Sequence, residues 1–198
     1  LLLLSLCGHQ AGGVHLPHTS GAVISPTNAT RIPVAVVMFD HTYMKLFDCF
    51  LRYWARQIID REHTFKLDVV VYDTVAYSHA QHIIRTYPAG IVRTVQLRDI
   101  RRPERRMFHR AHKASSAWPS VGYMAYFWQA MRERLELGDD VLHMDLDAIV
   151  VGDAWAPLAT TDPSADIVGQ LDVRGYIGTQ YILFRNTPAT KELVSHFS

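Results

Sequence analysis

The chain has 198 residues, of which 48% are hydrophobic and 20% are charged, so it is long and apolar enough to build one substantial core. Its 20 basic and 19 acidic residues leave a net charge of +1. Proteins that bind polyanions usually carry a clear basic excess, so nucleic acid is excluded as an expected partner.

Residues 1–31 are interpreted as a segment that precedes the folded domain. They are rich in Gly, His, Ser, Thr and Pro and show neither a helical nor a strand period. Leu1–Leu6 is an apolar run that is too short to span a bilayer. We interpret the run as the remnant of a signal peptide or membrane anchor that lies outside this chain, and the rest as a stem. The folded domain is then 32–198, and we expect it to be incomplete at its C-terminal end.

The N-terminal segment also bears on compartment. Asn28-Ala29-Thr30 is an N-glycosylation sequon within the stem. Together with the leucine run it favours the lumen of the secretory pathway, such as the Golgi, with a type II membrane anchor, over a cytosolic location. A glycan on Asn28 in the full-length protein would decide between the two. Cys7 and Cys49 could pair, but Cys49 falls in a helical pattern that favours a buried free thiol.

The folded domain begins with alternating apolar strands and amphipathic helices, a pattern typical of α/β proteins. Residues 33–39 form a nearly continuous apolar run, as in a strand buried on both faces, and a second such run spans 67–72. Apolar residues between the two recur at helical spacing: Leu46, Phe50, Leu51, Trp54 and Ile58. These elements predict one strand-helix-strand unit.

The rest of the domain continues this alternation. We expect helices at 76–87, 123–137 and 188–197, and strands at 91–97, 141–151, 165–172 and 176–184. Gly138 should end the middle helix. A basic stretch at 98–113 interrupts the pattern.

Two carboxylates interrupt the apolar run 141–151, at Asp145 and Asp147. Because side chains alternate along a strand at ~3.3 Å per residue, the two should point to the same side, roughly 6.5 Å apart. Two uncompensated carboxylates are costly in an apolar strand, so a cation is expected beside them. Oxygen ligands suit Mg²⁺ or Mn²⁺, which often complete their shell with substrate phosphates. The alternative is that the aspartates cap the strand end or pair with basic residues of 101–113.

Three segments of the sequence resemble one enzyme family. They are LGDDVLHMDLDAIV at 137–150, ADIVGQLD at 165–172 and GTQYILFRNTP at 178–188. They resemble the nucleotide-diphospho-sugar transferase family that includes plant rhamnogalacturonan xylosyltransferases, over about 32–197. The resemblance implies a GT-A fold, which is a Rossmann-like mixed sheet flanked by helices on both faces. It also implies a divalent metal, a UDP-sugar or GDP-sugar donor and a hydroxyl acceptor on a glycan or glycoprotein.

The resemblance also implies roles for residues on the donor side. Asp145 would contact the ribose or the metal, and Asp147 would bind the metal. Asp40, Thr42 and Tyr43, after the first strand, would hold the nucleotide base, with Tyr43 stacking on uracil. An ordinary strand-to-helix turn explains the same three residues.

Four further residues are candidates with an equally plain alternative. Asp73 is either a base contact or the N-terminal residue of a helix. Lys113 and Arg110 are candidate diphosphate contacts, although a solvated basic loop is the alternative. Asp172 is the candidate catalytic residue on the acceptor side, and otherwise a turn residue. The resemblance favours a retaining reaction, in which Asp172 would stabilise the transition state, over an inverting one with Asp172 as base.

Two other functions fit part of the pattern. A haloacid-dehalogenase-like phosphatase also places D-x-D after an apolar strand, with Asp145 as nucleophile, but that motif normally opens its domain. A non-catalytic sugar-binding relative would keep the fold without a complete site.

Overall fold

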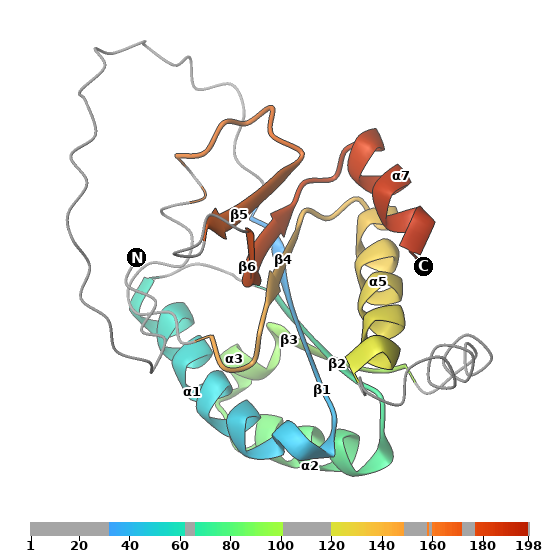
Figure 1. The fold of residues 1–198 in the computed structure, drawn as a ribbon. Helices are drawn as coiled ribbons and strands as arrows, with labels where there is room; N and C mark the ends of the chain where they lie inside the picture. The colour runs from blue at the N-terminus through green and yellow to red at the C-terminus, as the bar shows by residue number, and fades with distance from the viewer. Residues whose placement is uncertain are drawn as a thin grey trace, which may run out of the picture.

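The computed structural model describes residues 32–61, 66–100, 120–148, 158, 160–171 and 177–197. Their strands form one six-stranded sheet in the order β3-β2-β1-β4-β6-β5 (Figure 1). The strands are β1 Val34–Phe39, β2 Lys66–Val71, β3 Val95–Asp99, β4 Val141–Met144, β5 Ile167–Leu171 and β6 Ile177–Phe184.

The sheet is mixed, as predicted. β1 pairs in parallel with β2 and β4, and β2 pairs in parallel with β3. β6 is antiparallel to both β4 and β5. The carboxyl ends of β1, β2, β3 and β4 therefore meet at one edge, and β5 runs in the same direction as β4. The connections reverse between β1 and β4, which is where open α/β sheets bind ligands.

Helices cover both faces of the sheet, which confirms the predicted fold class (Figure 1). The helices are η1 His41–Tyr43, α1 Met44–Arg61, α2 Thr74–Arg85, α3 Ala89–Val92, α5 Ser120–Glu136 and α7 Pro188–Phe197. α1 and α2 pack on one face, and α5 and α7 pack on the other. Within the described ranges, none of these helices is long and apolar enough to cross a bilayer.

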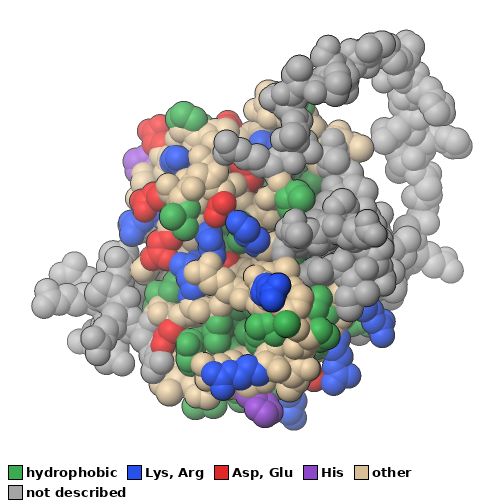
Figure 2. Space-filling view, turned by 180° about the vertical axis from the view of Figure 1, so that it is seen from behind, with side chains coloured by type: hydrophobic (Ala, Val, Ile, Leu, Met, Phe, Trp, Pro, Cys, Tyr) green, Lys and Arg blue, Asp and Glu red, His purple; other side chains and the backbone are tan. Residues whose placement is uncertain are grey.

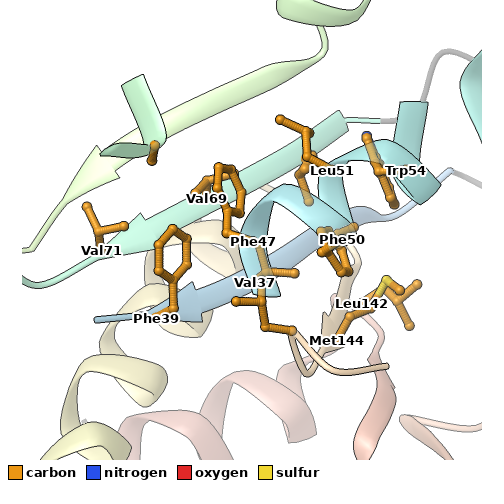
Figure 3. Close-up of a cluster of buried hydrophobic side chains, with 14 of the residues drawn as sticks. Val37, Phe39, Phe47, Phe50, Leu51, Trp54, Val69, Val71, Leu142 and Met144 are labelled. Atoms are coloured by element: carbon orange, nitrogen blue, oxygen red, sulfur yellow. The ribbon is translucent and has the colours of Figure 1, made fainter. Parts of the chain in front are cut away.

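The alternation of side chains along β1 builds a core on each face. Ala35, Val37 and Phe39 point toward α1 and α2, where Phe39 stacks on Phe47 with ring centroids 4.7 Å apart (Figure 3). Val36 and Met38 belong to the second core, beneath α5 and α7. β1 is therefore buried on both faces, as its unbroken apolar sequence predicts.

A tight turn connects α5 to β4, and it is tied to the end of β6. Gly138 has φ of +90°, a conformation that favours glycine, and it ends the helix as predicted. The Asn186 side chain donates to the carbonyl oxygens of Leu135 and Asp139, and the Asn186 backbone N–H donates to Asp140 at 2.7 Å. These contacts of Asn186 hold the start of β4 in place.

Some details of the predicted elements are wrong. Ile91 and Val92 lie in α3 and not in a strand, because the Pro88 carbonyl accepts hydrogen bonds from both of their backbone N–H groups. Cys49 is exposed, since it faces away from the sheet on α1. Leu46 is 38% exposed, and its neighbour Phe47 fills the core in its place.

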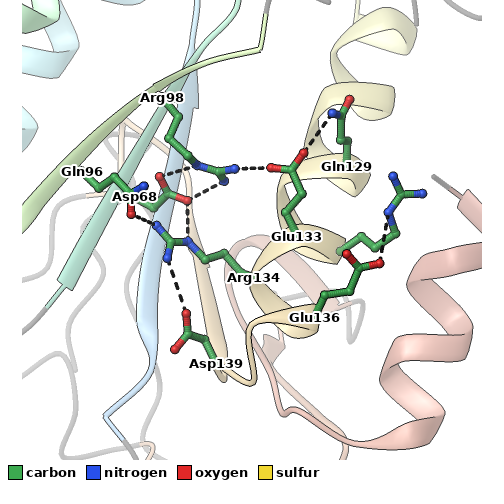
Figure 4. Close-up of polar contacts among 9 residues, drawn as sticks. Asp68, Gln96, Arg98, Gln129, Glu133, Arg134, Glu136 and Asp139 are labelled. Carbon is green, nitrogen blue, oxygen red and sulfur yellow. Dashed lines mark hydrogen bonds and ion pairs between the residues drawn. The ribbon is translucent and has the colours of Figure 1, made fainter. Parts of the chain in front are cut away.

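A buried ion-pair network joins the sheet to α5 (Figure 4). Asp68 on β2 is fully buried, and it accepts from Arg98 Nε at 2.8 Å and from Arg134 Nε at 2.7 Å. Arg98 also pairs with Glu133, and Arg134 also donates to Gln96. Burial lowers the pKa of Arg98, but the hydrogen bond and charge of Asp68, aided by Glu133, raise it above its ordinary value. Each buried charge thus depends on its partners.

We predict that Asp68→Asn lowers the free energy of unfolding by about 3 kcal/mol, because it leaves two buried guanidinium groups without their shared carboxylate. Urea denaturation measures the change. Glu136→Gln is the control: it removes an exposed i,i+4 ion pair with Arg132 and should change stability by less than about 0.5 kcal/mol. Equal losses in the two variants would contradict the role given to the network.

Asp73 caps the N-terminus of α2. Its Oδ1 accepts from the Ala76 backbone N–H at 2.7 Å, and its Oδ2 accepts from the His41 backbone N–H at 2.8 Å. Partial burial raises the pKa of Asp73, but the bonds from Ala76 and His41 favour the carboxylate more and lower the pKa below its ordinary value. The helix-cap alternative for this residue is therefore observed.

This lowered pKa makes a pH-dependent prediction. The stability contributed by the Asp73 charge is present above its unfolded pKa of about 3.9 and is lost as the pH falls through the lower folded pKa. Asp73→Asn, which can still cap the helix, should be less stable than wild type at pH 6, and the gap should narrow below about pH 4. Urea denaturation at several pH values measures it. A gap that stays constant with pH would show that the charge makes no contribution.

Candidate functional site

Carboxylates gather where the parallel strands end. Asp40 directly follows β1, Asp145 directly follows β4, and Asp73 lies two residues beyond β2. The hydrogen bond from the His41 backbone to Asp73 ties the ends of β1 and β2 together. Three of the residues predicted for a donor site are therefore at the same edge of the sheet, at the point where the connections reverse.

The predicted base-binding residues form a strand-to-helix turn. Asp40 Oδ1 accepts from the Thr42 backbone N–H at 2.9 Å and from the Thr42 hydroxyl, so the turn alternative also describes this segment. Within the described residues, no hydrogen bond engages Asp40 Oδ2. Tyr43 is 53% exposed at the end of η1. Its ring is accessible to a stacking partner.

The carboxylate pair does not lie on a strand, which corrects the sequence prediction. β4 ends at Met144, and the Ala148 backbone N–H donates to the Asp145 carbonyl at 3.0 Å, so the pair belongs to a turn. Asp145 keeps one bond to the sheet, from its backbone N–H to the Gln180 carbonyl at 3.0 Å. Because side chains alternate only along a strand, the two carboxylates in the turn need not point to the same side. The apolar run stops where the acidic residues begin.

His143 is a site residue that the sequence interpretation missed. It lies in the centre of β4, is 3% exposed, and places Nε2 3.1 Å from Asp145 Oδ1. The signal was present in the sequence, because His143 and Asp145 are two positions apart and His143 is the one polar residue of an otherwise apolar strand.

The donor atoms that remain suit a hard cation. Asp147 is exposed and makes no hydrogen bond or ion pair with the described part of the chain, and Asp145 is bonded through one oxygen only. Two carboxylates are the protein contribution that Mg²⁺ or Mn²⁺ often uses beside a diphosphate. Within the described ranges, no cluster of three or more acidic, His or Cys side chains forms a complete metal site. The residues fit a cation that takes further ligands from a substrate.

Three candidates lie outside the described residues: Arg110, Lys113 and Asp172. The strand that precedes Asp172 in sequence is β5, which ends at Leu171. β5 runs in the same direction as β4, so its carboxyl end faces the edge where Asp145 follows β4.

Charged side chains of both signs lie together on part of the described surface. On the face that Figure 2 shows, Lys and Arg side chains lie beside Asp and Glu side chains over the upper described part.

The fold is shared with solved glycosyltransferases. Galactosyltransferase LgtC, in complex with donor and acceptor sugar analogs, matches with a TM-score of 0.53 and 16% identity over 82% of this chain and 59% of LgtC. An active-site mutant of LgtC matches with a TM-score of 0.53 and 16% identity over 82% of this chain and 64% of the mutant chain. The bifunctional glycosyltransferase WbbM, in its apo form, matches with a TM-score of 0.51 and 16% identity over 86% of this chain and 34% of WbbM.

This chain therefore spans less than two thirds of each of these proteins. No family profile and no curated protein matches the sequence. At 16% identity the likeness establishes the fold, and the predicted GT-A type architecture, a mixed six-stranded sheet with helices on both faces, is confirmed.

Proposed function

We propose that the folded domain transfers a sugar from a nucleoside-diphosphate sugar to a hydroxyl of a glycan or glycoprotein. The observation that carries this proposal is the position of Asp145 and Asp147. They follow β4, beside β1, at the edge where the sheet reverses its connections. The same fold in LgtC has been solved with donor and acceptor sugar analogs.

The order of the strands favours a transferase over a phosphatase of the haloacid dehalogenase type. In that alternative, D-x-D normally follows the first strand of the domain. Here β1 is followed by a single carboxylate, Asp40, and the D-x-D follows β4. The phosphatase is therefore the less consistent candidate.

In the proposed site Asp145 and Asp147 hold a divalent cation, Mn²⁺ or Mg²⁺. When bound, such a cation neutralises negative charge on the diphosphate as the nucleotide leaves. One carboxylate oxygen of Asp145 contacts His143, and the other is available to the cation. The side chain of Asp147 is exposed and can turn toward the same cation.

The nucleotide would lie along the ends of β1 and β2. The turn held by the bond from Thr42 to Asp40 presents Tyr43 at the surface, where its ring can stack on uracil. Asp73 is committed to capping α2 and to holding His41, so its role toward the base is to fix the shape of this turn. Lys113 is proposed as a diphosphate contact.

The acceptor would approach the side of the site nearest β5. We propose Asp172 for this side on the family resemblance. In a retaining reaction it would stabilise the positive charge that develops on the sugar ring. We propose retention on the family resemblance.

Hydrolysis of a panel of UDP-sugars and GDP-sugars with Mn²⁺ tests the proposed function, with a generic phosphate ester as the competing substrate. We expect slow, Mn²⁺-dependent release of the nucleoside diphosphate from one or a few donors and no turnover of the ester. Turnover of the ester alone would support the phosphatase. Donor binding without turnover, even with acceptors added, would support a non-catalytic sugar-binding protein.

We predict that Asp145→Asn and Asp147→Asn each weaken Mn²⁺-dependent UDP binding at least tenfold, because each removes a charged ligand oxygen. Both should keep the wild-type unfolding temperature, since the Asp145 side chain is 32% exposed and Asp147 is exposed. Isothermal titration calorimetry and thermal unfolding measure the two properties. Glu192→Gln, an exposed charge change on α7, is the control and should leave both unchanged. Wild-type UDP affinity in both aspartate variants would refute the assignment.

We predict that Tyr43→Ala weakens UDP binding by about 1–3 kcal/mol, which is roughly 5- to 150-fold, through loss of base stacking. Tyr43→Phe keeps the ring and should bind as wild type does. Tyr53→Ala removes another partly exposed tyrosine, on α1, and should have no effect. Equal affinity in Tyr43→Ala and Tyr53→Ala would place the base elsewhere.

A further inference from the structure

The buried surroundings of His143 do not explain why a polar residue occupies this position. Its ring packs edge-on against Phe127 of α5, with centroids 4.6 Å apart, and it is 3% exposed. Among the described residues, Nδ1 is buried without a hydrogen-bond partner, whereas Nε2 lies 3.1 Å from Asp145 Oδ1. An apolar side chain would satisfy this part of the core at lower cost, because a buried polar atom without a partner destabilises the fold.

The hydrogen bond to Asp145 determines the tautomer of His143. A carboxylate only accepts hydrogen bonds, so Nε2 must donate. In the tautomer that carries its hydrogen on Nε2, Nδ1 carries none, and the burial of Nδ1 leaves no N–H unpaired. The contact is therefore a directed Nε2–H to carboxylate bond, in which the donor is held by the core.

The two residues differ in how firmly the backbone holds them. His143 lies inside β4, paired with Val36 on one side and Ile182 on the other. Asp145 lies just past the end of the strand, at the start of the turn, where its backbone N–H donates to Gln180 and its carbonyl accepts from Ala148. Without His143 the Asp145 carboxylate would be free to rotate between its rotamers. The imidazole thus extends the rigidity of the sheet to the first residue of the turn.

We propose that His143 is a positioning residue, which orients the Asp145 carboxylate so that Oδ1 is engaged and Oδ2 is presented to the cation and diphosphate. This inference rests on the proposed function, because it assigns Asp145 to a cation. The hydrogen bond from His143 itself orients the carboxylate of Asp145. Residues that orient metal ligands in this way typically contribute 10- to 100-fold to metal affinity.

The test compares three variants of His143, two of which, Gln and Met, have side chains of nearly equal length. His143→Gln keeps an N–H donor near the position of Nε2, and His143→Met keeps the length and apolar contacts without a donor. His143→Phe is a second variant without a donor, and it keeps a ring against Phe127. Mn²⁺ affinity is measured on the full chain with saturating UDP by the electron paramagnetic resonance signal of free Mn²⁺, and stability is measured by thermal unfolding.

We expect a 10- to 100-fold loss of Mn²⁺ affinity in His143→Met and His143→Phe, and affinity within about threefold of wild type in His143→Gln. The Met variant should unfold at the wild-type temperature or higher, since it removes a buried unpaired atom, so affinity and stability should change independently. Wild-type affinity in the Met and Phe variants, or a Gln variant as weak as the Met variant, would overturn the inference while the proposed function stands. Absence of Mn²⁺ binding in wild type would overturn both.

Discussion

The parallel pairing of β1 with β4 is the constraint on which the candidate site depends. The two strands are separated by about a hundred residues in sequence, yet Val34 pairs with Val141 and Val36 with His143. This register brings Asp145 to the edge where Asp40 follows β1. A different neighbour for β4 would leave its acidic turn at another part of the sheet. The proposed division of the site, with nucleotide at β1 and β2 and cation at β4, follows from this one pairing.

Buried and exposed carboxylates of the sheet differ in how they are paired. β1 and β2 are almost wholly buried, and the one buried charge within β2, Asp68, is neutralised by two arginines. Asp68 is thus used inside the fold, whereas Asp147 is exposed and not paired with any described residue. The buried carboxylate is thus used by the fold, and the exposed one is available for the cation of the proposed function. Composition alone cannot make the distinction.

The sequence predicts the fold well because its strongest signals are local. Unbroken apolar runs identify β1 and β2, and Gly138 identifies the end of α5. The prediction fails where hydrogen bonding outweighs intrinsic strand propensity. Ile91 and Val92 have high strand propensity, but the carbonyl of Pro88 recruits them into a helical turn whose Ile91 is buried.

The candidate site is less predictable from sequence than the fold. Asp145 and Asp147 were found because acidic residues interrupt an apolar run, but the turn that begins at Asp145 depends on the Ala148 hydrogen bond, which no residue pattern encodes. Asp68 was not singled out, because its partners Arg98 and Arg134 are 30 and 66 residues away in sequence. His143 was missed for a different reason. A lone histidine in a strand does not indicate a site until its ring is seen to contact Asp145.

The central claim is that the edge where β1, β2 and β4 end binds a cation together with a nucleoside diphosphate. Crystals of the full chain grown with UDP and Mn²⁺, with anomalous diffraction recorded near the manganese absorption edge, test it most directly. The account predicts an anomalous peak within coordination distance of Asp145, with the diphosphate on its far side and uracil beside Tyr43. Bound UDP without a manganese peak at this edge, or a peak remote from Asp145, would contradict it.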